Sequence, residues 1–474
     1  MFDINTLFFN GDAQMIASHK LCIVLGLSLA ATMTTAIQAQ EITQEHLLNP
    51  DIANPSVSFG EDIALDGHYV VVSAADDEEM GPNFGAVYLY EQSSGELIVK
   101  LFSDHAEIGG RFGTSIAIDD GLITVSAPSA QYFMDGQWTA GGVVFLFDAS
   151  TGEQIVRLTG NDTEINDHFG SEVALSNGVL AVGASGDGSL GPSTGAVYLF
   201  NTHTHEQIAK IKASDAHSFH QFGRQIAMDD GLLAVAAIEE LPDILGGSGS
   251  VYIYDISTQD ELGKLMSDDH AWHGRAGSDQ FGESLDIDDG IVVVGASSMT
   301  NLTKQSDETQ QGAAYIFDAF TGQQLRKLVA TDQGSDREYG AAVGIENGLI
   351  AIGSPGNQTM YFYDAATGEE QDRFSPAVPM EGSTFGAAIA MHNRNLAVGN
   401  NTFSTHFQDF YPSYLLHIDC KADLNSDDLL DFFDVSEFLE AFVSSDPVAD
   451  FTDDGLFDFF DVSDFLEEFS GNCL

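Results

Sequence analysis

Basic residues are scarce in this chain, which has 16 Lys and Arg against 73 Asp and Glu over 474 residues. The formal net charge of −57 opposes binding to nucleic acid or to an anionic membrane surface, because both are negatively charged themselves. Calcium, or a high-salt environment, suits such a chain better. The composition therefore predicts no nucleic-acid partner.

Long apolar runs are also missing. Lys20 precedes a short apolar core over residues 21–31, which falls short of the about 20 apolar residues that cross a bilayer. A basic residue before a short apolar core, with a small residue near Ala39, is typical of a secretory signal peptide. We predict a signal peptide over residues 1–39, cleaved near Ala39, and a secreted or cell-surface protein without a membrane span. Either Met1 or Met15 can start this leader.

Cysteine is rare, with three in the whole chain, and no lipobox surrounds Cys22 in the leader. After removal of the leader only Cys420 and Cys473 remain, and they bracket an acidic C-terminal stretch. In an oxidising compartment such a pair is expected to form a disulfide that ties the two ends of this stretch together. Two unrelated thiols are the alternative.

That acidic stretch contains one pattern twice, beginning at Ala422 and at Ala449. Counted from Asp423 and from Asp450, oxygen-bearing side chains fall at positions 1, 3, 5, 9 and 12 of a twelve-residue loop, and position 7 adds a backbone carbonyl. Calcium takes six to eight oxygen ligands, and this spacing wraps a loop around the ion. The predicted ligands of two calcium ions are Asp423, Asn425, Asp427, Leu429, Asp431 and Asp434 in the first loop, and Asp450, Thr452, Asp454, Leu456, Asp458 and Asp461 in the second.

Apolar residues at helical spacing follow each loop and predict a helix with one buried face. They are Val435, Phe438, Leu439 and Phe442 after the first loop, and Val462, Phe465, Leu466 and Phe469 after the second. Sixteen Asp and Glu and no Lys or Arg lie between Asp423 and Glu468, so folding of this stretch is expected to depend on calcium. A solvated or disordered acidic tail is the alternative.

Two facing loop-helix units over residues 420–474 resemble a dockerin module. The resemblance implies a small helical domain that docks onto a cohesin-like partner. Asp428 stands at position 6 of the first loop, where the turn prefers Gly, whereas the second loop has Gly455 and is expected to bind calcium more tightly. Positions 10 and 11, which read the partner in cellulosomal dockerins, are Phe432-Phe433 and Phe459-Phe460, and we take these four residues as partner-binding candidates.

Residues 40–419 are built from seven units that each begin with an aromatic-Gly pair, at Phe59, Phe112, Phe169, Phe222, Phe281, Tyr339 and Phe385. In most units a first strand, a two-residue turn of Asp-Gly or Asn-Gly and a second strand follow, which is the signal of a β-hairpin with a type I′ turn. These turns are expected at Asp66-Gly67, Asp120-Gly121, Asn177-Gly178, Asp230-Gly231, Asp289-Gly290 and Asn347-Gly348. The seventh unit has the weaker sequence Asn393-Arg394-Asn395.

A third strand that starts with Gly and a fourth strand complete most units, and the third strands begin at Gly85, Gly142, Gly195, Gly249 and Gly312. Four short antiparallel strands in seven repeats predict an all-β, seven-bladed β-propeller. The motifs resemble the FG-GAP repeats of integrin-α-like propellers, which implies binding of an extracellular ligand. In integrins a calcium loop often joins the first two strands of a blade; the Asp-Gly turn here is too short to surround an ion, so we predict no calcium there.

The seventh unit ends with its third strand at residues 414–418, whereas residues 42–50 precede the first aromatic-Gly pair. We therefore expect the N-terminal segment to supply the missing fourth strand and close the ring. Exposed aromatic residues on the variable connections are the candidates for binding a polysaccharide or a protein. They are Tyr132, Phe133, Trp138 and Trp272.

The sequence thus predicts a secreted, non-enzymatic binding or adhesion protein, with a propeller at residues 40–419 and a calcium-folded docking module at residues 420–474. The alternative is a carbohydrate-active hydrolase or lyase on a propeller scaffold. The chain has no Gly-x-Ser-x-Gly, HExxH or P-loop motif, which weakens the enzyme alternative without removing it. A calcium-cross-linked structural protein of the cell surface is a third interpretation.

Overall fold

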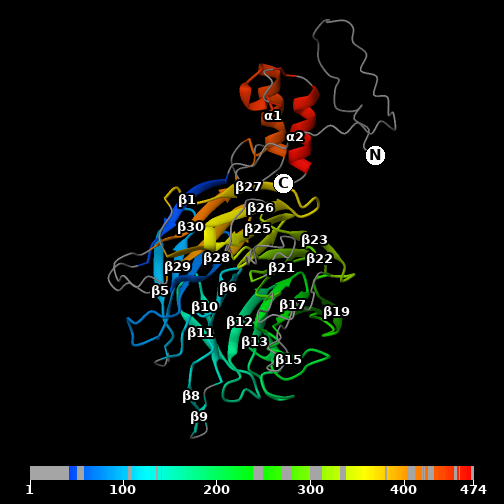
Figure 1. The fold of residues 1–474 in the computed structure, drawn as a ribbon. Helices are drawn as coiled ribbons and strands as arrows, with labels where there is room; N and C mark the ends of the chain where they lie inside the picture. Colours follow the sequence, from blue (N-terminus) through cyan, green and yellow to red (C-terminus); the bar gives the residue numbers. More distant parts are fainter. Residues whose placement is uncertain are drawn as a thin grey trace, which may run out of the picture. The chain divides into compact units, whose positions relative to one another are not determined.

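The computed structural model describes residues 42–50, 58–104, 109–134, 137–139, 141–238, 249–268, 280–298, 312–330, 338–378, 382–402, 411–418, 420, 422–424, 432–452, 456–457 and 459–470. Within these residues the strands form seven four-stranded antiparallel sheets and one two-stranded hairpin (Figure 1). Each four-stranded sheet is one blade.

Blades 1 to 6 each use four strands in the order of the chain. Blade 1 contains β2 (Phe59–Leu65), β3 (Tyr69–Ala74), β4 (Ala86–Glu91) and β5 (Leu97–Leu101). Blade 2 contains β6 (Ile116–Asp119), β7 (Leu122–Ala127), β10 (Val143–Asp148) and β11 (Gln154–Leu158), with the hairpin of β8 (Tyr132–Met134) and β9 (Gln137–Thr139) between β7 and β10. Blade 3 contains β12 (Phe169–Ser176), β13 (Val179–Ala184), β14 (Ala196–Asn201) and β15 (Gln207–Ile211).

The next three blades repeat this arrangement. Blade 4 contains β16 (Gln225–Asp229), β17 (Leu232–Ala237), β18 (Ser250–Asp255) and β19 (Glu261–Leu265). Blade 5 contains β20 (Ser284–Asp288), β21 (Ile291–Ala296), β22 (Ala313–Asp318) and β23 (Gln324–Leu328). Blade 6 contains β24 (Val343–Glu346), β25 (Leu349–Ser354), the 3₁₀ turn η2 (Pro355–Asn357), β26 (Thr359–Asp364) and β27 (Glu370–Phe374).

Blade 7 joins the two ends of the propeller. It contains β28 (Ser383–His392), β29 (Asn395–Thr402) and β30 (Ser413–Ile418), and its fourth strand is β1 (Ile42–Leu48) from the start of the described chain. β1 pairs antiparallel with β30, with Ile42 opposite Ile418 and Leu48 opposite Ser413. The predicted closure is therefore confirmed.

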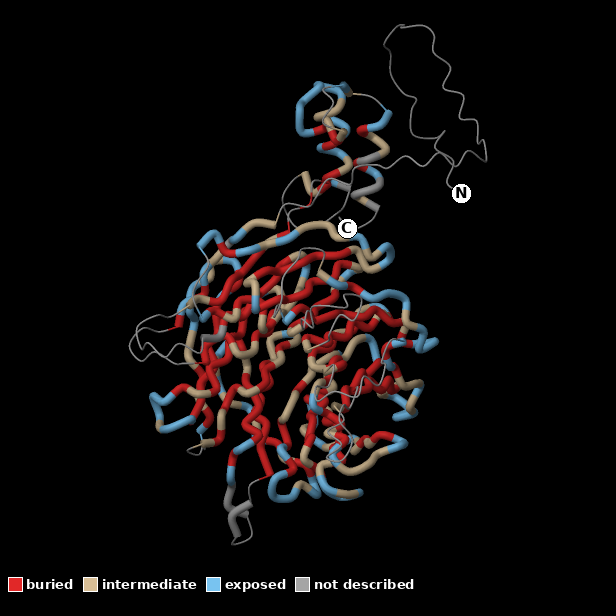
Figure 2. Tube along the Cα trace, in the orientation of Figure 1, coloured by how far each residue is buried: buried red, intermediate tan, exposed pale blue. Residues whose placement is uncertain are grey.

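The first strands of neighbouring blades contact one another in an unbroken circle, from β2 through β6, β12, β16, β20, β24 and β28 back to β2. They line the central axis. Each interface between two blades has its own cluster of buried apolar side chains, so the core of the propeller is a ring of seven such clusters. Buried residues follow the strands, and the exposed segments lie in the connections (Figure 2).

The repeated glycines mark places where neighbouring blades touch. A Cβ atom added at Gly142 would overlap the carbonyl oxygen of Phe169 in the next blade, and the third-strand glycines of blades 1, 3, 4 and 5 are equally close to the next blade. Each aromatic-Gly ring packs edge-on against an aromatic residue of the third strand in its own blade, as with Phe169 and Tyr198 at 5.3 Å between centroids. The motif therefore couples packing within a blade to packing between blades.

The hairpin turns agree with the prediction at five of the six expected positions, since both central residues have positive φ, as at Asp120 (47°) and Gly121 (71°). The first turn differs. Asp66 stays at the end of the strand and accepts hydrogen bonds from His68 N and Tyr69 N at 3.2 and 3.0 Å, so the turn is Gly67-His68, with positive φ at Gly67. In blade 7, Asn393 and Arg394 both adopt positive φ without a glycine.

Antiparallel pairing gives the propeller two faces. The turn face carries the hairpins between first and second strands, and the FG face carries the aromatic-Gly pairs and the connections between second and third strands. Ile42 and Ile418 are paired, and Ile418 N donates to the carbonyl of Arg394 in the hairpin turn of blade 7. The chain therefore enters and leaves the propeller at the turn face.

The C-terminal part contains two short helices, α1 (Phe432–Ser444) and α2 (Phe459–Ser470), with the 3₁₀ turn η3 (Pro447–Ala449) between them. No helix among the described residues has the length and apolar character needed to cross a membrane.

Candidate functional site

Six of the sixteen Lys and Arg occupy one position, opposite the aromatic residue of the third strand in blades 1 to 6. They are Lys100, Arg157, Lys210, Lys264, Lys327 and Arg373. In blades 1, 3, 4, 5 and 6 the cation lies over the tyrosine ring, 4.7 to 5.2 Å from its centroid. Blade 7 has Leu47 of β1 at this position.

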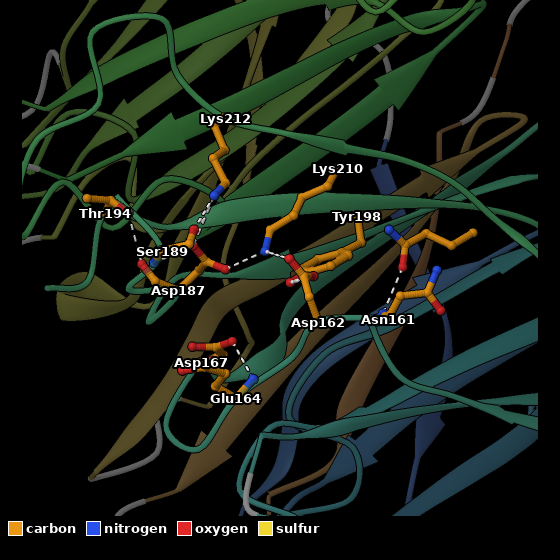
Figure 3. A network of polar contacts seen from close by, with 11 residues as sticks. Asn161, Asp162, Glu164, Asp167, Asp187, Ser189, Thr194, Tyr198, Lys210 and Lys212 are labelled. Carbon is orange, nitrogen blue, oxygen red and sulfur yellow. Dashed lines mark hydrogen bonds and ion pairs between the residues drawn. The ribbon is translucent and has the colours of Figure 1, made fainter. Parts of the chain in front are cut away.

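Blade 3 shows how acids complete this arrangement (Figure 3). Lys210 Nζ lies 2.8 Å from Asp162 Oδ2 and 2.7 Å from Asp187 Oδ2, and Tyr198 donates its hydroxyl to Asp162 Oδ1 at 2.9 Å. The side chain of Asp187 is only 2% exposed. Burial raises the pKa of Asp187, but hydrogen bonds from Lys210 and Ser189 outweigh burial and hold the pKa below its usual value.

Blade 4 repeats the network with Lys264, Tyr252 and Asp215. Asp162 and Asp215 each lie seven residues before an aromatic-Gly pair, at Phe169 and Phe222. Both carboxylates contact side chains of the third and fourth strands, which favours a structural role. These networks use a large share of the basic residues to hold the outer strands of the blades, so we do not assign them a ligand.

A second set of acids joins the first strands around the axis. Asp62 Oδ2 accepts from Ile116 N, and Asp286 Oδ2 accepts from Ile345 N, each at 2.8 Å across a blade boundary. A first strand has no sheet partner on the side of the axis, and these carboxylates satisfy its backbone N–H groups. Burial raises the pKa of Asp62 to about 6 and that of Asp286 to about 7.

A cavity of about 450 Å³ opens on the FG face, where blades 5, 6 and 7 meet. The polar residues in its lining are Gln280, Glu283, Ser297, Ser298, Glu338 and Thr384, and Ala341, Pro355 and Ala387 complete the wall. Ser297 donates its hydroxyl to Glu283 Oε2, and Ser298 donates to Gln280 Oε1. Among the described residues, the lining contains two carboxylates and no Lys, Arg or His.

The cavity exists because two neighbouring blades depart from the repeat. Two residues after the aromatic ring, blades 1 to 5 carry Glu61, Thr114, Ser171, Arg224 and Glu283. Blades 6 and 7 carry Ala341 and Ala387 at the same position, and both line the cavity. Ala341 and Ala387 are the smallest residues at this position in the seven units, and their short side chains face the cavity.

Burial raises the pKa of Glu283, and the charge of Glu338 raises it further. The hydrogen bond from Ser297 and the charge of Arg224 act in the opposite direction but do not cancel this rise. The net rise therefore comes mainly from burial of the Glu283 carboxylate.

In the C-terminal part, the position-12 residues Asp434 and Asp461 are fully buried. Asp434 Oδ1 accepts from Leu424 N at 3.0 Å, and Asp461 Oδ1 accepts from Thr452 N at 3.1 Å and from Thr452 Oγ1 at 3.0 Å. Thr452 Oγ1 also lies 3.5 Å from Asp450 Oδ1. In each predicted loop, the carboxylate at position 12 therefore binds a residue near the start of the same loop.

Asp423, the first predicted ligand, forms an ion pair with the propeller: Arg394 Nη2 lies 2.7 Å from its Oδ2 atom. Leu456, which offers a backbone carbonyl, has an exposed side chain. The other predicted ligands, Asn425, Asp427, Leu429, Asp431, Asp454 and Asp458, lie outside the described residues. Within the described part of the chain, no three His, Cys, Asp or Glu side chains gather as a metal site.

The helical stripes predicted after the loops are confirmed only in part. Phe438 and Phe465 are buried in the centre of the helical part, but Leu439 and Leu466 are 52% and 51% exposed. Val435, Phe442, Val462 and Phe469 are partly buried against the same cluster, so the two leucines are the residues that depart from the predicted stripes.

Of the partner-binding candidates, Phe433, Phe459 and Phe460 are 64%, 74% and 61% exposed, and Phe432 begins α1. Tyr132 and Phe133 lie on β8 and Trp138 on β9, with Phe133 opposite Trp138 in the hairpin (Figure 1). Trp272 and Cys473 lie outside the described residues, and Cys420 is buried. The disulfide between Cys420 and Cys473 stays a prediction.

The fold defines the class of protein as a seven-bladed β-propeller built from repeated four-stranded units. Four segments match the family model of the FG-GAP repeat, at residues 43–90, 153–200, 205–254 and 261–317. Each match runs from the fourth strand of one blade to the third strand of the next, and the first begins in β1, which is the fourth strand of blade 7. No curated protein matches the chain.

Proposed function

We propose that the protein is secreted and binds an extracellular ligand through the FG face of its propeller, while its C-terminal module attaches it to a surface or an assembly partner. An FG-GAP propeller fits a protein of the binding or adhesion type. The observation that carries the proposal is the division between the two faces. The chain enters and leaves at the turn face, whereas the cavity and the β8–β9 hairpin belong to connections of the FG face.

The C-terminal module is proposed to fold around two calcium ions held by the two predicted sets of oxygen ligands. The buried carboxylates of Asp434 and Asp461 support this proposal, because a buried charge requires partners, and each already points at the backbone of its own loop. Calcium would supply the positive charge that this acidic stretch lacks. The first site is proposed to be weaker, because Asp423 is paired with Arg394 and because Asp428 replaces the preferred Gly.

Attachment is proposed to use the aromatic pairs at the start of each helix. Phe433 and Phe460 occupy equivalent positions in the two copies and are both largely exposed. Exposed aromatic side chains on a rigid helix are typical anchors of protein interfaces. The proposed partner is a cohesin-like protein, and the Cys420–Cys473 disulfide is proposed to stabilise the module.

The test uses full-length protein, with calcium present, on immobilised extracellular polysaccharides and proteins. Trp138→Ala and Trp272→Ala are expected to weaken retention of the ligand. Phe320→Ala is the matched control, because Phe320 is 68% exposed in the turn after β22, on the turn face. Retention that depends on Phe320 and not on either tryptophan would contradict binding through the FG face.

Two further results bear on the same proposal. The N-terminus of protein recovered from the growth medium is expected to lie just after Ala39. Bound polysaccharide is expected to stay intact; its cleavage, lost on substitution of acids on the FG face, would favour a carbohydrate-active enzyme instead.

A further inference from the structure

The FG-face cavity has a chemical character that separates it from the rest of the ring. It combines acceptor oxygen atoms with a short apolar wall, and the described residues of its lining include no cationic side chain. The hydroxyl groups of Ser297 and Ser298 are directed at Glu283 and Gln280 rather than left to bind a ligand as donors. A ligand for this cavity must therefore bring the donors and the positive charge.

We propose that this cavity binds a primary alkylammonium group, with Glu283 and Glu338 as its acceptors and Ala341, Pro355 and Ala387 against the alkyl chain. This inference rests on the proposed binding function of the propeller and names the class of ligand. The size of about 450 Å³ is in the range of small-molecule sites. An ammonium group offers three donors and one positive charge, which matches two carboxylates and an amide oxygen.

The backbone at the rim of the cavity follows the repeat, and the set of side chains there differs from that of the other blades. Gln280 and Glu338 both have φ of 53°, in the left-handed region that residues other than Gly rarely adopt. The equivalent residues of blades 2, 3 and 4 share this conformation, so the backbone is a property of the repeat. Gln280 has a counterpart in Gln221 of blade 4, whereas Glu338 is the one acid at this rim position among the seven units of the sequence.

A comparison with the equivalent position in blade 1 supports the assignment of a cationic ligand. In blade 1 the equivalent of Glu283 is Glu61, and Arg111 Nη2 lies 2.9 Å from its Oε1 atom. This cation comes from blade 2, at the position before the aromatic ring that Glu338 occupies in blade 6, so the cavity has a second carboxylate where blade 2 has an arginine. The raised pKa of Glu283 is consistent with a carboxylate that a bound cation would stabilise.

The experiment is calorimetric titration of the full-length protein with 1,4-diaminobutane and with Nα-acetyl-lysine-methylamide, against 1,4-butanediol as the uncharged control. The diamine represents a free amine and the lysine derivative represents a side chain displayed by a protein. Saturable binding of either amine, without binding of the diol, is the expected result, and the tighter of the two identifies the source. No saturable binding of either amine up to about 10 mM would overturn the inference.

Variants assign any binding to the cavity. Glu283→Gln and Glu338→Gln keep the shape and remove one charge each, and each is expected to raise Kd about tenfold or more. Glu61→Gln is the matched control in blade 1 and is expected to leave Kd within about twofold. Equal Kd values for all three variants and the unchanged protein would place the amine elsewhere and overturn the inference.

Ala341→Arg supplies a second line of evidence, because it introduces the residue that blade 4 carries at this position. The tethered guanidinium is expected to abolish amine binding by occupying the space between the carboxylates. Retention on immobilised extracellular ligands is measured on the same samples. If the protein binds no amine but is still retained on the extracellular ligands, this inference alone fails. If retention is lost, the result bears on the proposed function.

Discussion

Phe438 and Phe465 stack face to face, with ring centroids 4.0 Å apart and an angle of 4° between their planes. They occupy the same position in the two copies of the acidic pattern, and both are buried, which makes them the centre of the C-terminal module. The two copies therefore meet through equivalent residues, as a pseudo-twofold pair would.

Phe465→Ala is expected to unfold the module locally, because it removes one of the two rings that stack at the centre of its core. The expected cost is about 3 kcal/mol, measured as the loss of protection of α1 and α2 amides in hydrogen exchange. Leu466→Ala is the control, since Leu466 is 51% exposed, and it is expected to cost less than about 1 kcal/mol. Equal effects of the two changes would contradict the central stack.

Closure of the propeller by β1 predicts a contrast between two neighbouring leucines. Leu48 is fully buried in the cluster shared by blades 1 and 7, whereas Leu47 is 43% exposed. Leu48→Ala is expected to lower the free energy of unfolding by about 3 kcal/mol, and Leu47→Ala by less than about 1 kcal/mol. Urea unfolding followed by tyrosine fluorescence measures both, and a larger effect at Leu47 would place β1 in the wrong register.

The blade networks predict that Lys210 matters more than Lys264. Lys210→Met removes the closer of the two cations beside the buried Asp187 and leaves Lys212, 3.5 Å from its Oδ1 atom, at an expected cost of about 2 kcal/mol. Lys264→Met leaves Asp215, whose side chain is 53% exposed, and is expected to cost less than about 1 kcal/mol because water replaces the lost partner. Urea unfolding at matched ionic strength measures the difference, and similar costs would show that burial of Asp187 has little energetic effect.

Asp286 predicts an unusual dependence of stability on pH. Burial raises its pKa from 3.8 to about 7, so the folded state holds a proton that the unfolded state has released between these two values. The free energy of unfolding from this group therefore falls as pH rises from about 4 to about 7.

Asp286→Asn removes this titration and is expected to shrink the stability difference between about pH 5 and about pH 8 by at least about 1 kcal/mol. Asp318→Asn is the control. Hydrogen bonds from Thr321 lower the pKa of Asp318, so its contribution is lost only below about pH 4 and leaves the difference unchanged. An unchanged difference in Asp286→Asn would show that this carboxyl titrates normally.

The blades could be predicted from the sequence because each unit repeats the residues that its geometry requires. A Gly that starts a third strand lies against the next blade, and an Asn-Gly or Asp-Gly turn tolerates positive φ, so both leave a periodic trace. The first turn was predicted wrongly because the side chain of Asp66 binds the following backbone, which a two-residue motif does not reveal.

The cavity could not be predicted in the same way. Ala341 and Ala387 are 46 residues apart and meet only because blades 6 and 7 are neighbours in the ring. The sequence does show two alanines at a repeat position that carries polar residues in the other five units. That these two alanines line one cavity follows only from the folded ring. The exposure of Leu439 and Leu466, next to the buried Phe438 and Phe465, likewise depends on how the two helices pack, which the periodic pattern does not specify.

The most direct test of the proposed attachment module is the number of calcium ions that the full-length protein binds after removal of bound metal with a chelator. Isothermal titration is expected to give two ions per chain, with the weaker site lost in Asp434→Asn and the tighter site lost in Asp461→Asn. A stoichiometry that neither substitution changes, or an absence of calcium binding, would contradict the calcium-folded module.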